Sequence, residues 1–252
     1  MRKRIVCILL FLCTLSTIFA SLLRTVGQVG LDDELYFQLQ MEAGILDSAG
    51  ISESALKHLD KALSEYLAGS TYSLVTPEGQ SAIQVEVFGQ IQPAFNEREL
   101  VHMADCQRLF QMLILVMDIA RDLAAPALLL ATLILWRTTP KERRPSKRQL
   151  MRAVGLAPLA LLVPLGAFAI WAAANFNGAF TFFHRLLFTN DLWLLDPRTD
   201  LLIRICPSSM FAQMGLRIAV QALARTAAIV SALLLGIQFS SLLSKRFEEY
   251  MK

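Results

Sequence analysis

The sequence lacks the residues and motifs on which many soluble enzymes depend. It has three histidines and four cysteines, and it contains no C-x-x-C pair or histidine–cysteine cluster of the kind that holds structural zinc. It also has no G-x-S-x-G elbow, H-E-x-x-H helix, P-loop or dinucleotide-binding glycine fingerprint. The sequence therefore lacks the motifs of the usual serine hydrolases, zinc proteases and nucleotide-binding proteins. We expect no metal, no cofactor, no nucleotide and no nucleic-acid partner.

Charge is scarce as well. Charged residues make up 18% of the chain and hydrophobic residues 55%, with a mean hydropathy of +0.48. A chain of 252 residues with this composition is too apolar for an ordinary soluble domain and too short for a large transporter. The predicted fold class is a membrane all-α core of four transmembrane helices with a small extracytoplasmic α+β insert.

The first two predicted spans lie at the N-terminus and in the middle of the chain. Residues 1–23 form the first transmembrane helix, because Ile5 to Leu23 carry no charge and are long enough to cross a bilayer. The same pattern is compatible with a cleaved signal peptide, although the apolar run is longer than usual. Helical apolar spacing continues from Asn96 to Trp136, and Leu123 to Trp136 is uncharged. A straight helix from His102 to Trp136 would measure about 50 Å, so it either breaks or projects beyond the bilayer.

Basic residues set the predicted orientation of residues 101–252, which hold spans two to four. The third span covers Val154 to Ala174 and the fourth Leu216 to Leu243. The loop 137–152 stays in the cytoplasm because it is crowded with basic residues: Arg137, Lys141, Arg143, Arg144, Lys147, Arg148 and Arg152. We therefore predict a multi-pass cell-membrane protein with both termini in the cytoplasm and the loop 175–215 outside, forming the active-site loop.

Residues 24–100 are predicted to form an extracytoplasmic insert of mixed secondary structure. Helical patterning covers 32–47 and 52–67, with Ser52 and Glu53 as a start and Ala68-Gly69 as a stop. A strand at 72–75 and a strand at 83–87 are predicted to pair around the turn formed by 77–79.

Charged residues inside the predicted spans are expected to face one another. Asp118 and Asp122 lie on one side of the second helix with Arg121, and Arg217 and Arg225 lie on one side of the fourth. Because unpaired charges in lipid are costly, we predict that the two sets form a structural ion pair between these helices; direct participation in chemistry is the alternative.

Two of the three histidines are candidates for chemistry. His58 lies on a polar helix and is expected to be solvated. His102 begins the second helix and His184 lies in the loop 175–215, so both are predicted on the outer side. Carboxylates are near each of them in sequence: Glu99, Asp105, Asp191 and Asp196. This set favours a general acid/base site, with an interfacial hydrogen-bonding role or a metal site as the alternatives.

The segments around these histidines resemble those of a family of small bacterial integral membrane proteins that includes the lipoprotein intramolecular transacylase. The resemblance rests on F-N-E-R-E-x-x-H-M-x-D at Phe95 to Asp105 and on F-H-x-x-F-x-N-D-x-W-x-x-x-P-x-x-D, with one looser position, at Phe183 to Asp200. The topology agrees along the whole chain, and the insert is less distinctive. Cys106 departs from the family pattern, in which an aliphatic residue is commoner.

The resemblance implies that an ester-linked acyl chain on the diacylglyceryl group of a lipoprotein moves to the α-amino group of its N-terminal cysteine. His102 would be the general base, oriented by Asp105 or Glu99, with His184 stabilising the oxyanion; the reverse assignment is open, and Asp191 completes the catalytic set. Substrate contacts would come from Arg98, Phe183, Asn190, Trp193 and Asp196. The expected partners are diacylglyceryl-modified lipoproteins and membrane lipid, and the protein is expected to be a monomer.

Other interpretations remain open from the sequence. The same histidines would serve a membrane hydrolase or acyltransferase that acts on another ester, and the outer domain would also suit a non-enzymatic accessory or sensor protein. Cys106 and Cys206 are both predicted outside, where they could form a disulfide.

Overall fold

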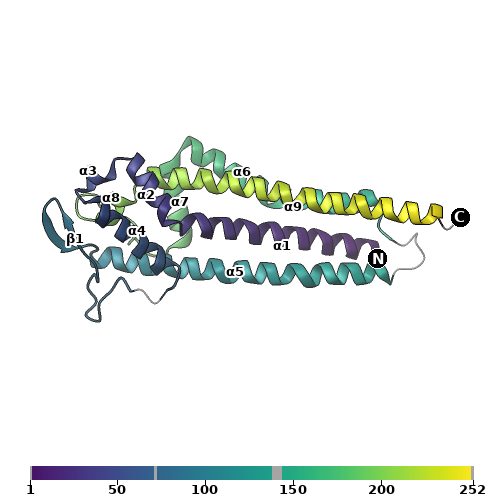
Figure 1. Ribbon diagram of the computed structural model, residues 1–252, viewed down its shortest axis with the longest axis horizontal. Helices are drawn as coiled ribbons and strands as arrows, with labels where there is room; N and C mark the ends of the chain where they lie inside the picture. The colour runs from purple at the N-terminus through teal and green to yellow at the C-terminus, as the bar shows by residue number, and fades with distance from the viewer. Residues whose placement is uncertain (1, 71–72, 138–143, 251–252) are drawn as a thin grey trace. The chain divides into compact units, whose positions relative to one another are not determined.

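The computed structural model describes residues 2–70, 73–137 and 144–250, and the chain divides into two compact units (Figure 1). Unit 1 contains residues 1–24, 115–169 and 220–252, and unit 2 contains residues 25–114 and 170–219. The elements in chain order are α1 Arg2–Gly30, α2 Asp33–Glu42, α3 Ile45–Ala49, α4 Glu53–Leu67, β1 Gln84–Val87, β2 Gln90–Pro93, α5 Glu97–Trp136, α6 Lys147–Ala174, α7 Phe176–Leu187, α8 Leu201–Ile205 and α9 Ser208–Tyr250.

Unit 1 is built from stretches of four long helices. In Figure 1, α1 and α6 run in one direction through this unit and α5 and α9 run in the other. Among the described residues, three helical segments are long and apolar enough to cross a membrane: Arg2–Gly30, Lys147–Ala174 and Ser208–Leu242. These contain the first, third and fourth predicted spans. The second predicted span lies within α5 and is not among the three.

Helix α5 is continuous over 40 residues, although Pro126 lies inside it. At a rise of about 1.5 Å per residue it is about 60 Å long. The helix from His102 to Trp136 is therefore not broken. The other alternative, a helix that projects beyond the bilayer, stays a prediction.

The charged residues on α5 pair with each other along that helix. Arg121 contacts Asp118 at 3.1 Å and Asp122 at 3.2 Å, which are local ion pairs one turn or less apart. An ion pair from Asp118 or Asp122 to Arg225 or Arg217 of α9 stays a prediction.

Unit 2 begins with the short helices of the predicted insert, and their ends are capped as the sequence indicates. Asp32 accepts a hydrogen bond from the Leu35 N–H at 3.0 Å at the start of α2. Ser52 accepts one from the Ala55 N–H at 3.2 Å at the start of α4. These side chains satisfy N–H groups that have no partner within the helix. The prediction of a helix over 52–67 is confirmed, whereas the helix predicted over 32–47 is divided between α2 and α3.

The strand pairing differs from the prediction. β1 pairs antiparallel with β2, which follows it directly, and not with residues 72–75. A single bridge joins Val75 to Ser81 across the predicted turn, and Tyr72 lies outside the described residues. The β1–β2 turn is formed by Phe88 and Gly89, both at positive φ, which matches the right-handed twist of the two strands. Phe88 adopts this conformation while its N–H donates to the Gly50 carbonyl at 2.7 Å.

The predicted loop 175–215 is largely helical and shares one hydrophobic core with the insert. It contains α7, α8 and the start of α9. Buried side chains from α2, α4, β1 and the start of α5 pack with those of α8 and α9, among them Leu39, Leu59, Leu100, Ile205 and Met210. Segments on either side of α5 and α6 in sequence therefore build one unit. All four cysteines are free thiols, so Cys106 and Cys206 do not form a disulfide.

A buried polar pair joins three helices of this core. Gln40 of α2 donates from Nε2 to Asp60 Oδ1 of α4 at 2.9 Å and to the Ile205 carbonyl of α8 at 3.0 Å. Asp60 is 1% exposed, and burial raises its pKa to about 7, with the hydrogen bond from Gln40 opposing the rise. Because the folded pKa is raised, the stability that Asp60 contributes is fully present below its ordinary pKa of 3.8. That contribution is lost as the pH rises through about 7.

We therefore expect the substitution Asp60→Asn to remove a pH-dependent part of the stability. Between pH 7.5 and pH 5 the wild type should gain thermal stability relative to this variant, by on the order of 5 °C in the unfolding midpoint. The comparison isolates Asp60 because the histidines contribute equally to both proteins. Thermal unfolding in detergent measures it, with Asp47→Asn, an exposed carboxylate on α3, as the control. Identical pH dependence in the wild type and Asp60→Asn would contradict the assignment.

Candidate active site

The start of α5 is closed by a reciprocal pair of hydrogen bonds. Asn96 Oδ1 accepts from the Glu99 N–H at 3.1 Å, and Glu99 Oε2 accepts from the Asn96 N–H at 2.8 Å. This is a capping box, in which each side chain satisfies the backbone donor of the other residue. The second oxygen, Glu99 Oε1, accepts from the Leu202 N–H of α8 at 2.6 Å. One carboxylate therefore caps α5 and also binds a segment that lies a hundred residues later.

Asp200, directly before α8, binds the start of α5 in return through the Asn96 side chain. Its Oδ1 accepts from Asn96 Nδ2 and from the Thr199 hydroxyl, each at 2.8 Å, and its Oδ2 accepts from the Asp196 N–H at 2.7 Å. Burial alone would raise the pKa of Asp200, but these hydrogen bonds outweigh it and the pKa is lowered. We refer to these contacts as the Asn96–Glu99–Asp200 network. It joins the two motif segments of the sequence directly.

The two histidines meet inside unit 2. His102 lies one turn after Glu99 on α5, and His184 lies near the end of α7. Their ring centroids are 6.3 Å apart with an angle of 37° between the ring planes, and each residue is 8% exposed. Phe188 packs against both rings, at 5.2 Å from His102 and 5.6 Å from His184. The two imidazoles therefore lie close together, and a joint catalytic role for them stays a prediction.

Aromatic rings surround His184 on several sides. Trp193 stacks on the imidazole at 4.9 Å, Phe180 lies at 4.1 Å and Phe183 meets it edge-on at 5.5 Å. Trp193 is buried, whereas Phe183 is about half exposed. The motif residues Trp193 and Phe183 thus contact a histidine directly, and Phe183 also offers apolar surface to the surroundings.

Burial keeps both imidazoles neutral near pH 7. It lowers the pKa of His102 to about 4, and the neighbouring His184 lowers it further, while Asp105 opposes the change. Burial also lowers the pKa of His184, against an opposing effect of its hydrogen bond to the Phe180 carbonyl. That bond, 2.7 Å from Nδ1 to the carbonyl oxygen, requires the Nδ1 proton because a carbonyl only accepts. The Nε2 lone pair of His184 is then available to accept a proton.

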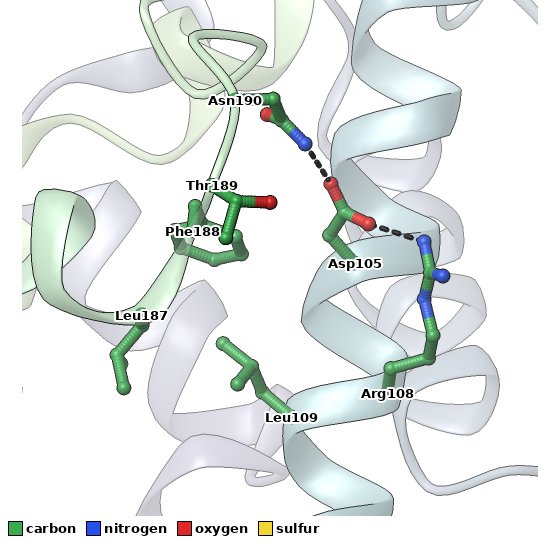
Figure 2. A pocket seen from close by; sticks show the side chains of 7 residues that line it. All are labelled: Asp105, Arg108, Leu109, Leu187, Phe188, Thr189 and Asn190. Carbon is green, nitrogen blue, oxygen red and sulfur yellow. Dashed lines mark hydrogen bonds and ion pairs between the residues drawn. The ribbon is translucent and has the colours of Figure 1, made fainter.

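Neither carboxylate predicted to orient His102 hydrogen-bonds to it among the described contacts. Glu99 is 1% exposed and both of its oxygens accept backbone N–H groups. Burial raises its pKa, and these two N–H donors oppose the rise. Asp105 pairs with Arg108 through Oδ1 and accepts from Asn190 Nδ2 at 2.8 Å through Oδ2 (Figure 2). Asp105 therefore acts on His102 through its charge, and Glu99 belongs to the Asn96–Glu99–Asp200 network.

An open pocket of about 150 Å³ lies next to this pair of histidines. Figure 2 shows Asn190 and Asp105 on one side of it, Leu187 and Leu109 on the other, and Phe188 beside Thr189. Arg108 completes the lining. The imidazoles themselves do not line the pocket, whereas Phe188, which packs on both, does. The pocket lining thus combines polar and apolar side chains.

The remaining candidate residues make local contacts. Arg98 donates to the Leu194 carbonyl at 3.0 Å, and Asp196 pairs with Arg198 at 2.7 Å. The hydrogen bonds from Arg198 lower the pKa of Asp196 to about 2. Asp191 is exposed, and so is His58, as predicted. Catalytic and substrate-binding roles for these residues stay predictions. Within the described ranges there is no group of three or more histidine, cysteine or acidic side chains that could hold a metal ion.

Sequence reasoning missed several residues that the structure brings to the site. Asn96 and Asp200 are part of the two motifs, so their motif positions were a usable signal. Phe188 is also a motif position, but nothing in the sequence indicated that it would contact both histidines and line a pocket. Cys106 follows His102 by one turn, with Sγ 3.6 Å from Nε2, and helical spacing alone could have placed it there.

The fold and the site define a class: a mostly helical integral membrane protein with a buried pair of neutral histidines beside an amphiphilic pocket. A family model described as lipoprotein intramolecular transacylase Lit matches residues 7–211. The chain therefore belongs to the lipoprotein intramolecular transacylase Lit family, which is a family of acyltransferases.

Solved structures agree with this assignment at the level of the fold. The chain is similar to the membrane integral lipoprotein intramolecular transacylase Lit from Bacillus cereus, with a TM-score of 0.63, 20% identity and 98% of each chain covered. Two variants of that protein, in which one histidine is replaced by arginine or by alanine, match with the same TM-score and identity. The alignments cover 96% of this chain and 94% of the arginine variant, and 95% of this chain and 96% of the alanine variant. No curated protein sequence matches the chain.

The network predicts a specific effect of changing Glu99. In Glu99→Gln one of the two accepted N–H groups would face an amide NH₂, so a buried backbone donor would lose its partner at a cost of about 1–3 kcal/mol. We expect a lower unfolding midpoint, measured by thermal unfolding in detergent. Glu97→Gln is the matched control, because Glu97 is exposed in the same helical turn. Equal stability of the two variants would show that the Leu202 N–H does not depend on Glu99.

Proposed function

We propose that this protein catalyses an acyl transfer within one molecule of a diacylglyceryl-modified bacterial lipoprotein. The acyl chain moves from an ester of the glyceryl group to the α-amino group of the N-terminal cysteine, which leaves a lyso-form lipoprotein. The observation that carries the proposal is the pair of neutral, buried imidazoles 6.3 Å apart, in a chain of the transacylase family.

The reaction needs a proton acceptor and a hydrogen-bond donor at the same place. The amine nitrogen attacks the ester carbonyl carbon, a C–N bond forms, and the nitrogen loses a proton to one imidazole. The oxyanion of the tetrahedral intermediate is stabilised by an N–H donor, for which the other imidazole is suited. The C–O bond to the glyceryl oxygen then breaks, and that oxygen takes the proton. The products are an amide and an alcohol, and no atoms are lost.

The surroundings of the histidines suit this chemistry. Donor and acceptor belong to one substrate molecule, so positioning supplies a large part of the rate enhancement. At 8% exposure the imidazoles are shielded from water, which favours attack by an amine held in place over hydrolysis. The pocket places Asp105, Thr189 and Asn190 for the polar end of the substrate and Leu109, Leu187 and Phe188 for an acyl chain. Arg98, Trp193, Phe183, Asp191 and Asp196 are proposed to complete the site.

We further propose four spans, with the later part of α5, which includes Leu123 to Trp136, as the second, and the site at the outer face of the cell membrane. Within unit 1 the start of α1, the end of α5, the start of α6 and the end of α9 lie at one end in Figure 1. These ends carry basic residues: Arg2, Lys3, Arg137, Lys147, Arg148 and Arg246. By the positive-inside rule this end faces the cytoplasm, with both termini. The protein is proposed to act as a monomer.

Mass spectrometry of a model lipoprotein co-expressed with this protein tests the function. We expect unchanged total mass with one acyl group moved to the N-terminal amine. His102→Ala and His184→Ala should each lower the rate by roughly 10²–10⁴-fold, the range for loss of a general acid or base. His58→Ala serves as the control. Loss of one acyl mass would identify a hydrolase instead, and full activity of both variants would favour an accessory or sensor protein.

The lowered histidine pKa values predict the pH dependence of the reaction. The substrate α-amine, with an ordinary pKa of about 7.7–8.0, must be deprotonated, so the logarithm of the rate should rise with a slope of about 1 below that pH. Because burial lowers the pKa of His102 to about 4 and also lowers that of His184, the slope should steepen only below the ordinary histidine pKa of 6.5. Single-turnover rates in lipid nanodiscs measure this. A slope of 2 already at pH 6 would mean that an imidazole keeps its ordinary pKa.

A further inference from the structure

Helix α7 presents a row of large apolar side chains to its surroundings. The row consists of Phe182, Phe183, Leu186 and Leu187, all of which are exposed. Their spacing of one and four residues places them on one side of the helix, and we call them the α7 apolar face. His184, two residues before Leu186, points to the other side and is buried. The helix that positions a candidate catalytic group therefore leaves much of its apolar side exposed.

The α7 apolar face adjoins the end of a candidate membrane span. Helix α6 is long and apolar enough to cross a membrane, and only Asn175 separates its last residue from α7. The Asn175 side chain accepts from the Gly178 N–H at 3.0 Å, which caps the new helix directly after the old one ends. Trp171, near the end of α6, meets Phe182 edge-on at 5.5 Å. The face thus begins at the point along the chain where the span leaves the hydrocarbon.

The charge of α7 favours lipid as the occupant of this face. The helix contains no acidic residue, and its one permanently charged residue is Arg185, which is exposed in the last turn. A helix that lies in the headgroup region of a bilayer places its apolar side among the acyl chains, and its basic side chains reach the lipid phosphates. A protein partner is less suited to this position, because lipid is the surrounding medium at the end of a span.

The α7 apolar face also reaches the candidate active site. The Phe183 ring meets the His184 imidazole edge-on at 5.5 Å, although about half of Phe183 stays exposed. Leu187 is exposed as well, and it lines the open pocket together with Phe188. Side chains of one helix therefore contact the surroundings and the site at the same time. They form an apolar connection from the outside of the protein to the pocket.

We propose that α7 lies in the outer interface of the membrane with its apolar face among the acyl chains, and that the acyl chain of the substrate enters the pocket along this face. The lipid contact is independent of the proposed function, whereas the entry route rests on it. Along this route the acyl chains of the lipoprotein stay in an apolar environment while the ester group reaches His184. The face takes no part in forming or breaking bonds.

Photo-cross-linking identifies the occupant of the face. The photoreactive residue p-benzoylphenylalanine replaces Leu186 in the full-length protein, which is reconstituted in vesicles of phosphatidylcholine and phosphatidylglycerol. Leu186 is 69% exposed, and Ile91 on β2, which is 78% exposed, receives the same replacement as the matched control. We expect phospholipid adducts, detected by mass spectrometry, at position 186 and none at position 91. A cross-linked dimer of the protein at position 186, or equal lipid labelling of the two positions, overturns the proposal.

Transfer kinetics test the entry route. A charge on the face would draw α7 away from the acyl chains, so Leu186→Glu should lower kcat/KM in nanodiscs by on the order of 10-fold. Ile91→Glu places the same charge on an exposed apolar position of the insert and should leave the rate unchanged. Both variants should keep the wild-type unfolding midpoint in detergent, because both side chains are exposed.

Two outcomes separate the route from the function. Wild-type kinetics of Leu186→Glu would overturn the entry route. If lipid adducts form at position 186 but the wild type moves no acyl group, the proposed function fails and the lipid contact of α7 stands.

Discussion

The arrangement of the site depends on one carboxylate that serves two distant parts of the chain. Glu99 caps the start of α5 with one oxygen and holds the Leu202 N–H with the other, and Asp200 returns the connection through the Asn96 side chain. Together with the hydrogen bonds from Asn190 to Asp105 and from Arg98 to the Leu194 carbonyl, this network joins the segment that carries Trp193 to the helix that carries His102. Buried carboxylates whose oxygens are all hydrogen-bonded give a fixed geometry, which apolar packing alone does not.

The burial of two imidazoles is the feature from which the chemistry follows. Removing a histidine from water disfavours its charged form, and a second histidine nearby disfavours it further. His102 experiences both effects, whereas the pKa of His184 is lowered by burial against the opposing effect of its hydrogen bond to the Phe180 carbonyl. The aromatic rings around His184 that exclude water also provide a surface compatible with lipid. A neutral acid/base pair and an apolar surrounding are therefore two results of one packing arrangement.

Much of the helical framework could be predicted from the sequence because it depends on local signals. Ser52 and Ala68-Gly69 bound α4 as expected, and uncharged runs located three of the long helices. The number of membrane crossings predicted that His102 and His184 lie on the same side, and the two motifs indicated that they belong to one site. The partner of β1 could not, because Gln90 to Pro93 has little apolar alternation, and its pairing depends on the turn at Phe88-Gly89. The role of Glu99 was also out of reach, since its second partner is a backbone N–H that no side-chain pattern reveals.

Because α5 is continuous, the number of residues between two positions decides which face of the helix each side chain occupies. Glu99, His102 and Cys106 share one face because three and seven residues correspond to nearly whole turns, and the capping at Asn96 sets where that face begins. One inserted or deleted residue between Glu99 and His102 would rotate everything after it by roughly 100° and turn the imidazole away from His184. A substitution in this stretch therefore changes one side chain and leaves the direction of the His102 imidazole in place. A change in the length of the stretch alters that direction completely.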